Sequence, residues 1–227
     1  MKEPSEKSAR EKGAWVSWGT GLLMLLLAAE TWKAVDGRWG YIGHMPVYIY
    51  AGVLTLYLGA ERIAYRGSGS KGKQTKIWTR HLLLLFWLPL LIVPVLEYSL
   101  YPRYDFTVTV IGAALTLLGT GLRAWGLWTL GKYFSAHIEI KADHELVETG
   151  PYKFIRHPAY AGNILQAVGI PLILNAYFSM SISAVLIALF LYRLKLEEEV
   201  LAREVKGYGA YMIGLTGSYR RYGKLES

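Results

Sequence analysis

Cysteine is absent from this chain of 227 residues, and charged residues are few. Without a thiol, the protein can form no disulfide, thiolate zinc site, iron–sulfur cluster or cysteine nucleophile. Asp, Glu, Lys and Arg together make up 19% of the chain, whereas hydrophobic residues make up 53%. Because a soluble domain usually has about a quarter of charged residues, this composition favours a membrane protein and excludes a disordered or fibrous chain.

Six uncharged apolar stretches follow one another along the chain, at about residues 14–29, 41–60, 82–96, 106–122, 160–174 and 177–191. A helix needs ~20 residues to cross the ~30 Å hydrocarbon core, so the first four suffice once flanking aromatic residues are included. The last two are short and are separated by Asn175 and Ala176 alone, which predicts a helical hairpin. We therefore expect an all-α, polytopic membrane bundle of about six spans, the first of them a mature span and not a signal peptide.

The positive charge is unevenly distributed between the two sides of this bundle. Of the 25 Lys and Arg residues, all but Lys33, Arg38 and Arg103 fall on the side that holds both termini. Cytoplasmic loops carry such an excess of basic residues, so both termini are expected in the cytoplasm. The net charge of +8 is thereby explained without a nucleic-acid partner.

Two nucleotide-binding patterns occur in contexts that do not suit them. Residues 67–74 resemble a phosphate-binding loop but end in Gln74 where a hydroxyl is needed, so we interpret them as a flexible basic connector. Residues 119–124 match GxGxxA within an apolar helix that no strand precedes. We expect no Rossmann domain, and we interpret Gly112, Gly119 and Gly121 as positions where helices approach closely.

Polar residues concentrate in segments 137–160 and 192–211. The first holds His137, His144 and His157, whose spacing matches no metal-ligand pattern, so no metal site is expected. If the last apolar stretch continues as a helix into the cytoplasm, Arg193 and Glu197 share one of its faces. The hairpin should then place the segment around His157 opposite these residues, although a solvated helix face and a helix start at Pro158 explain the same residues more simply.

Both segments resemble one family of membrane enzymes. The residues that carry the resemblance are Gly121-Leu-Arg-Ala-Trp125, the run HxLVxxGPYxxxRHPxYxG from His144 to Gly162, Arg193-x3-Glu197-Glu198, and Gly207-Tyr208-x2-Tyr211. Together they resemble the isoprenylcysteine carboxyl methyltransferase and phospholipid methyltransferase superfamily, from Gly119 to Tyr211. The resemblance implies an integral membrane enzyme that transfers a methyl group from S-adenosyl-L-methionine to a lipophilic acceptor, with a cofactor pocket at the cytoplasmic face.

The resemblance also implies the roles of individual residues. Arg193 would face the substrate, and His157 and Glu197 would complete the catalytic set. Cofactor contacts would come from His137, His144, Glu145, Leu146, Val147, Tyr152, Arg156, His157, Pro158, Ala159, Tyr160, Glu197 and Glu198. Two registers stay open, since an ungapped alignment assigns the cofactor glutamate to Glu198, whereas a spacing of four from Arg193 assigns it to Glu197.

The acceptor is left open by the sequence. A carboxylate acceptor would need no general base and could be oriented by Arg193, whereas a phospholipid amine or a thiol would have to lose a proton to His157 or a glutamate. The alternative from a different class is a small membrane transporter or scaffold, which would use the same spans and place its histidines and glutamates along an ion pathway. We expect a prenylated or otherwise lipophilic substrate from the bilayer, membrane lipids as surroundings, and a division into residues 1–130, with four spans, and 131–227, the catalytic region.

Overall fold

The structure is a computed structural model that describes residues 45–64, 78–131, 146–205 and 207–216. Within these ranges the chain is helical and contains no strand, so the predicted all-α class is confirmed for them. The helices are α2 (Met45–Ala64), α3 (Trp78–Leu100), α4 (Phe106–Leu130), the short 3₁₀ helix η3 (Gly150–Lys153), α5 (Pro158–Ile173), α6 (Met180–Glu204) and α7 (Tyr208–Thr216).

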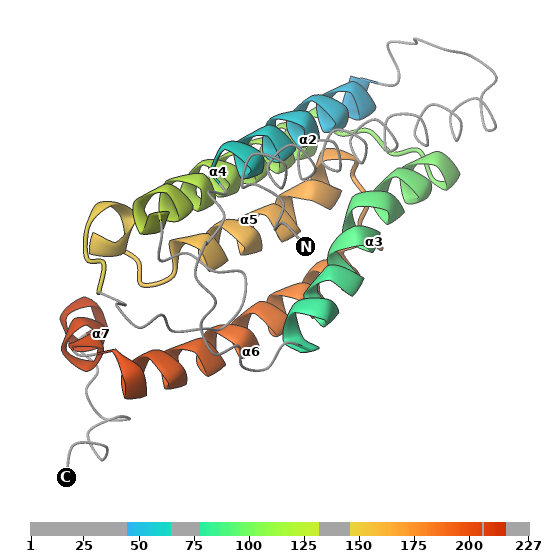
Figure 1. Ribbon diagram of the computed structural model, residues 1–227. Coiled ribbons are helices and arrows are strands. Elements are labelled where there is room, and N and C mark those ends of the chain that lie inside the picture. The colour runs from blue at the N-terminus through green and yellow to red at the C-terminus, as the bar shows by residue number, and fades with distance from the viewer. Residues whose placement is uncertain (1–44, 65–77, 132–145, 206, 217–227) are drawn as a thin grey trace, which may run out of the picture.

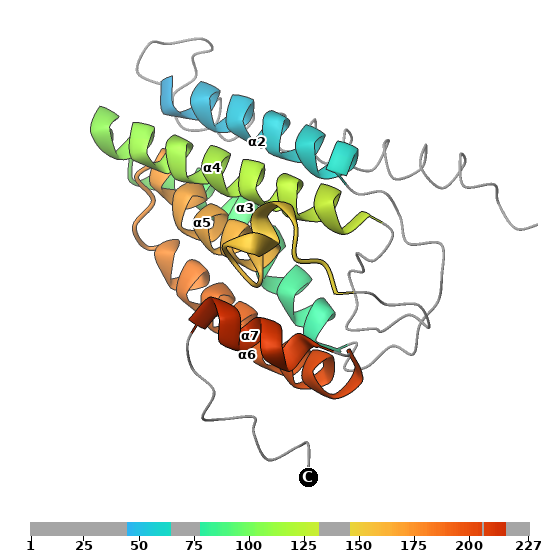
Figure 2. The same cartoon turned by 90° about the vertical axis from the view of Figure 1, so that its left-hand side faces the viewer.

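The helices form two packed groups that α5 connects. Helix α4 lies between α2 and α5, while α3 lies along α6, and α5 contacts all four of these helices (Figures 1 and 2). The buried core between them is apolar and includes Tyr50, Leu90, Ile170, Leu186 and Phe190. Buried side chains from α2, α3, α5 and α6 thus form one core that joins the two groups.

Glycines determine how closely α4 and α5 approach each other. A Cβ atom on Gly112 would lie 2.8 Å from the carbonyl oxygen of Gly169, and one on Gly119 would lie 2.6 Å from that of Gly162. The prediction of close helix contact at Gly112 and Gly119 is therefore confirmed. For Gly121 it is wrong, because no atom lies within 4 Å of the position of its Cβ. Gly121 lies two residues after Gly119, so it points about 200° away around the helix and is exposed.

The predicted hairpin of α5 and α6 is present. Helix α5 begins at Pro158, whose fixed φ and missing N–H suit the first helical position. Asn175 adopts a left-handed φ of 54° in the turn, and its side-chain amide donates to the hydroxyl of Thr109 at 3.0 Å. Helix α6 then runs without interruption to Glu204, which confirms that it continues beyond its apolar part.

Two of the described helices are long and apolar enough to cross a membrane, at His81–Leu100 and Phe106–Leu130. Helix α5 has only 16 residues, fewer than the ~20 that a bilayer requires. The apolar stretch at residues 14–29 lies outside the described residues. By length and composition, the described part of the chain thus contains two candidate spans.

Candidate functional site

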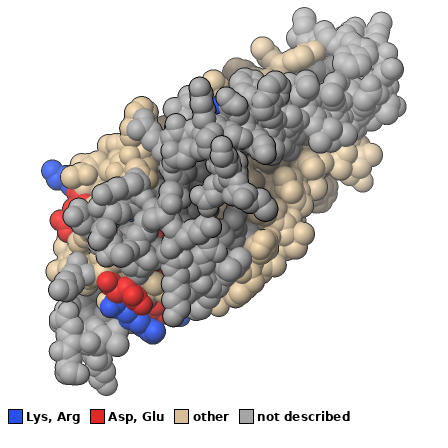
Figure 3. Space-filling view, viewed as in Figure 1, with Lys and Arg blue, Asp and Glu red and all other residues tan. Residues whose placement is uncertain are grey.

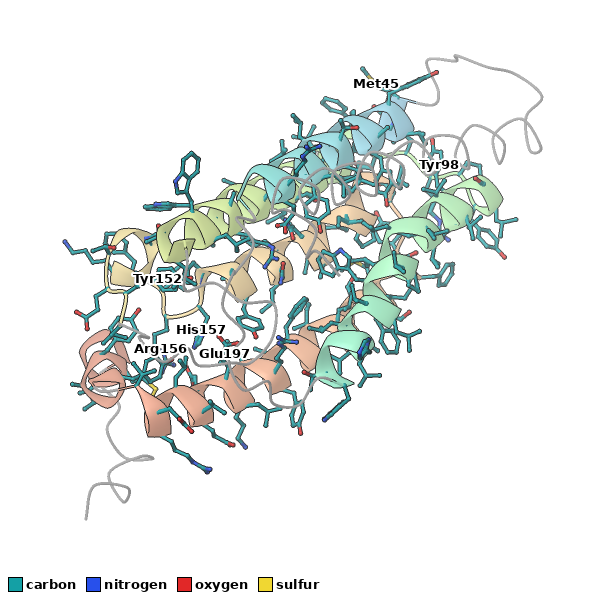
Figure 4. The ribbon with its side chains drawn as sticks, viewed as in Figure 1. Met45, Tyr98, Tyr152, Arg156, His157 and Glu197 are labelled. Carbon is teal, nitrogen blue, oxygen red and sulfur yellow. The ribbon has the colours of Figure 1, made fainter. Side chains whose placement is uncertain are left out.

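The predicted site residues gather where α5 begins and the polar part of α6 passes it. Arg156 and His157 come directly before α5, and Glu197 lies opposite them on α6 (Figure 4). A left-handed Gly150, with φ of 59°, and the 3₁₀ turn that follows bring the chain to Pro158. Because Pro158 occupies the first helical position, His157 is the residue at which the chain enters α5.

Glu198 lies at the centre of the first part of the site. Its Oε1 atom lies 3.1 Å from the Nη1 atom of Arg156 and 3.2 Å from the Nε2 atom of His157. Glu198 is buried, with 7% of its surface exposed. Two basic side chains from the start of α5 thus share one carboxylate oxygen of α6, as the hairpin predicted.

The carboxyl group of Glu198 is held in its charged form. Burial acts to raise its pKa, but the hydrogen bond and the charge of His157, together with the charge of Arg156, outweigh this effect. The pKa of Glu198 therefore lies below its ordinary value. A carboxylate that is ionised at neutral pH can hold a cationic group at this position.

Tyr160 joins the two residues on the other face of α6. Its hydroxyl donates to the Oε2 atom of Glu197 at 2.5 Å and accepts a hydrogen bond of 3.0 Å from the Nε atom of Arg193. The Nη1 atom of Arg193 lies 3.4 Å from the hydroxyl of Thr79 on α3. Arg193 is only 6% exposed, and its guanidinium is therefore fixed by groups from α5 and α3.

Helix α7 contributes two tyrosines to which the sequence analysis assigned no role. The Tyr208 hydroxyl lies 3.2 Å from His157 Nε2, and the Tyr211 hydroxyl donates to the backbone carbonyl of Tyr152 at 2.5 Å. Burial, followed by nearby negative charge, raises the pKa of Tyr208 and of Tyr152, so both phenols stay neutral at neutral pH. The motif Gly207-Tyr208-x2-Tyr211 was a signal for these residues, whereas nothing in the sequence pointed to Thr79.

Four other predicted cofactor residues are apolar and lie in the described part of the chain. Leu146 packs against the apolar residues of α7, and Val147 is half-buried beside it in the chain. Pro158 is buried against Gly126 of α4, and Ala159 is half-buried. His137, His144 and Glu145 lie outside the described residues. The other ten implied cofactor contacts, together with Arg193, thus lie between Leu146 and Glu198 in a part of the chain that the structure describes.

Charged side chains are unevenly distributed over the face that Figure 3 shows. The visible Lys, Arg, Asp and Glu gather mainly toward the end where η3 and α7 lie (Figure 3). At the opposite end, the guanidinium of the exposed Arg103 lies over the rings of Tyr177 and Phe178, at 5.7 and 5.3 Å. Among the described residues, no group of three or more His, Asp or Glu side chains could hold a metal ion.

One known protein family matches the part of the chain that holds this cluster. Residues 111–203 match the isoprenylcysteine carboxyl methyltransferase family. The predicted resemblance to this superfamily is therefore confirmed. The matched region begins within α4 and ends near the end of α6, so it contains Arg156, His157, Tyr160 and the three α6 residues of the cluster.

Individual proteins are also similar to the chain over part of its length. The chain is 38% identical over 96 residues to the protein-S-isoprenylcysteine O-methyltransferase of Saccharomyces cerevisiae, which covers 41% of this chain and 40% of that protein. It is 37% identical over 93 residues to the uncharacterized protein YpbQ of Bacillus subtilis, covering 40% of this chain and 55% of YpbQ. The chain is also 25% identical over 173 residues to a probable protein-S-isoprenylcysteine O-methyltransferase of rice (Oryza sativa subsp. indica). This match covers 71% of this chain and 90% of the rice protein. The chain therefore spans about half the length, or less, of the first two relatives.

Proposed function

We propose that this protein is an integral membrane methyltransferase that transfers a methyl group from S-adenosyl-L-methionine to the carboxylate of an isoprenylcysteine-like acceptor. One observation carries the proposal: the family match at residues 111–203 contains the buried cluster in which two glutamates of α6 meet basic and aromatic side chains from the start of α5. Several of the relatives that the chain matches are named protein-S-isoprenylcysteine O-methyltransferases.

The chemistry of the cluster suits this cofactor. S-adenosyl-L-methionine carries a cationic sulfonium and an ammonium group, and it supplies the methyl group that is transferred. Glu197 and Glu198 offer carboxylates to these cations, and the rings of Tyr160 and Tyr208 offer aromatic faces. Because Glu198 is buried and ionised, its attraction for a cation is little weakened by water.

Arg193 would act on the acceptor. A guanidinium can bind a carboxylate through two parallel hydrogen bonds, and the guanidinium of Arg193 is held in place by Tyr160 and Thr79. Methyl transfer to a carboxylate needs no general base, so positioning of the two reactants and exclusion of water are what the protein has to supply. His157 and Glu197 then serve to orient neighbouring groups.

The proposed surroundings are a membrane. We retain about six spans with both termini in the cytoplasm, and the division into residues 1–130 and 131–227. The two apolar helices α3 and α4 support a membrane setting, as do the exposed Leu85, Leu118 and Leu191 on three different helices. A site at the end of the helices can receive a polar cofactor from water and a prenylated acceptor from lipid.

Calorimetry with S-adenosylhomocysteine on the purified protein tests the cofactor assignment. We expect saturable binding by the wild type, and a folded sample that does not bind would overturn the proposal. The acceptor is then tested by incubating the protein with methyl-labelled cofactor and, in parallel, a farnesylated cysteine derivative, phosphatidylethanolamine and a lipophilic thiol. Label in the base-labile ester of the first acceptor supports the proposal, whereas label only in an amine or thiol assigns the enzyme to another branch of the superfamily.

A further inference from the structure

Helix α7 folds back over the end of α6. Val205 ends α6 in an extended conformation, and Gly207 takes a left-handed φ of 84°, which reverses the direction of the chain. Val205, Tyr208 and Met212 are buried together, and Leu146, Leu201, Ala202 and Tyr211 pack against them. This helix begins beyond residue 203, where the family match ends, so its role does not follow from the match.

One hydroxyl of α7 points into the cluster. Tyr208 is 4% exposed, and its hydroxyl lies 3.2 Å from His157 Nε2. The same nitrogen lies 3.2 Å from Glu198 Oε1. A single ring atom thus has two partners, one from α6 and one from α7, on the same edge of the imidazole.

The two partners suit different states of this nitrogen. An ionised carboxylate only accepts hydrogen bonds, so Glu198 can pair with Nε2 when the nitrogen carries a proton. A phenol can also donate, so Tyr208 can pair with Nε2 when the nitrogen is bare. His157 therefore keeps a hydrogen-bond partner at Nε2 in either tautomer without turning its ring. This matters because the hydrogen bonds of a histidine determine the orientation of its ring.

We propose that Tyr208 is a positioning residue of the site, whose hydroxyl fixes the Nε2 edge of His157 beside Glu198 and so holds both for the cofactor. The effect on cofactor binding rests on the proposed function, whereas the contact between Tyr208 and His157 does not. The groups that face His157 from the elements around it are Arg156 before α5, the Tyr160 ring at 5.8 Å, Glu198 on α6 and Tyr208 on α7. Burial raises the pKa of Tyr208, so its proton is retained for donation.

The test compares two hydroxyls on the same helix. Tyr208→Phe removes the hydroxyl at His157 and keeps the ring that packs against Tyr211 at 5.9 Å. Tyr211→Phe removes the hydroxyl that donates to the Tyr152 carbonyl and keeps the Tyr208 hydroxyl beside His157. Nitrogen-15 NMR of histidine-labelled protein without cofactor, with His157 assigned by its loss in His157→Gln, reports the state of Nε2 directly.

We expect the Nε2 resonance of His157 to move toward the protonated position in Tyr208→Phe, because Glu198 becomes its remaining partner, and to stay in place in Tyr211→Phe. Affinity for S-adenosylhomocysteine should fall about threefold to tenfold in Tyr208→Phe, the range expected for one lost hydrogen bond. An unmoved resonance in Tyr208→Phe, or equal movement in both variants, would overturn the inference. Failure of the wild type to bind the cofactor would instead overturn the proposed function.

A measurement that keeps Tyr208, and compares the wild type with Glu198→Gln, covers the case in which Tyr208→Phe does not fold. The ring Cζ resonance of carbon-labelled Tyr208 should respond when Glu198→Gln changes the partners of Nε2. If this resonance does not change, Tyr208 is not coupled to His157, and the inference is likewise overturned.

Discussion

Gly119 of α4 and Gly162 of α5 pack reciprocally, because a Cβ atom on either glycine would lie within 2.6 Å of the carbonyl oxygen of the other. Such a distance is shorter than real Cβ contacts, so only hydrogen can occupy either position. In lipid, where apolar side chains gain little from association, close backbone contact is a main source of helix packing. Gly162 lies two residues after Tyr160 on α5, so this contact also helps to position the start of the site.

Gly162→Ala should therefore destabilise the protein. Its Cβ would meet the carbonyl of Gly119 at 2.5 Å and the Cβ of Arg123 at 2.8 Å, so α4 and α5 would have to separate. Overpacking of this kind costs about 1–3 kcal/mol. Gly121→Ala, with open space around its Cβ, is the control and should be neutral or slightly stabilising. Thermal unfolding in detergent measures both variants, and equal melting temperatures would contradict the argument.

Much of this arrangement was predictable from local sequence patterns. Pro158 predicted the start of α5, and the short connection at Asn175 predicted the hairpin that brings His157 to Glu198. The pattern could not separate Gly119 from Gly121, because both are small and only the rotation of the helix against α5 decides which one is in contact. Thr79 reaches Arg193 from α3, a contact between distant parts of the chain that no spacing indicates.

Glu198→Gln should weaken cofactor binding. The substitution keeps the size of the side chain but removes the charge that Arg156 and His157 share, and a charged hydrogen bond is worth about 1.5–3 kcal/mol. We expect the affinity for S-adenosylhomocysteine, measured by calorimetry, to fall about tenfold or more. Glu204→Gln, at the exposed end of α6, should bind as the wild type does. Wild-type affinity in Glu198→Gln would remove Glu198 from the cofactor site.

The ionised state of Glu198 predicts a pH dependence of stability. Because its folded pKa lies below the ordinary value of 4.5, the group stabilises the fold above pH 4.5, and this contribution is lost as the pH falls through the lower folded value. The wild type should therefore lose more thermal stability than Glu198→Gln between about pH 5 and pH 3. Melting curves at matched ionic strength measure the difference. Parallel curves for the two proteins would show that the carboxylate is not stabilised in the folded state.

Glu97 should be required for the stability of the hairpin. Its carboxylate accepts from the backbone N–H of Phe178 at 2.9 Å and from both the N–H and the hydroxyl of Ser179, at 2.8 and 2.7 Å. It thereby caps α6 from α3, and Glu97→Ala would leave three donors without this partner, at a cost of about 2 kcal/mol or more. Ser181→Ala, which loses only a local bond to the Phe178 carbonyl, is the control for thermal unfolding. A melting temperature of Glu97→Ala equal to that of this control would contradict the capping role.

Arg193→Lys should separate acceptor binding from cofactor binding. A lysine keeps the charge but offers neither the planar pair of donors that a carboxylate prefers nor the geometry that reaches both Tyr160 and Thr79. We expect the KM for a farnesylated cysteine acceptor to rise about tenfold or more. Affinity for S-adenosylhomocysteine should change less, because Glu198, Arg156 and His157 keep their contacts. Arg203→Lys, exposed in the last turn of α6, controls for the change of residue type. If Arg193→Lys instead weakens cofactor binding and leaves the acceptor KM unchanged, Arg193 serves the cofactor and the acceptor carboxylate is held elsewhere.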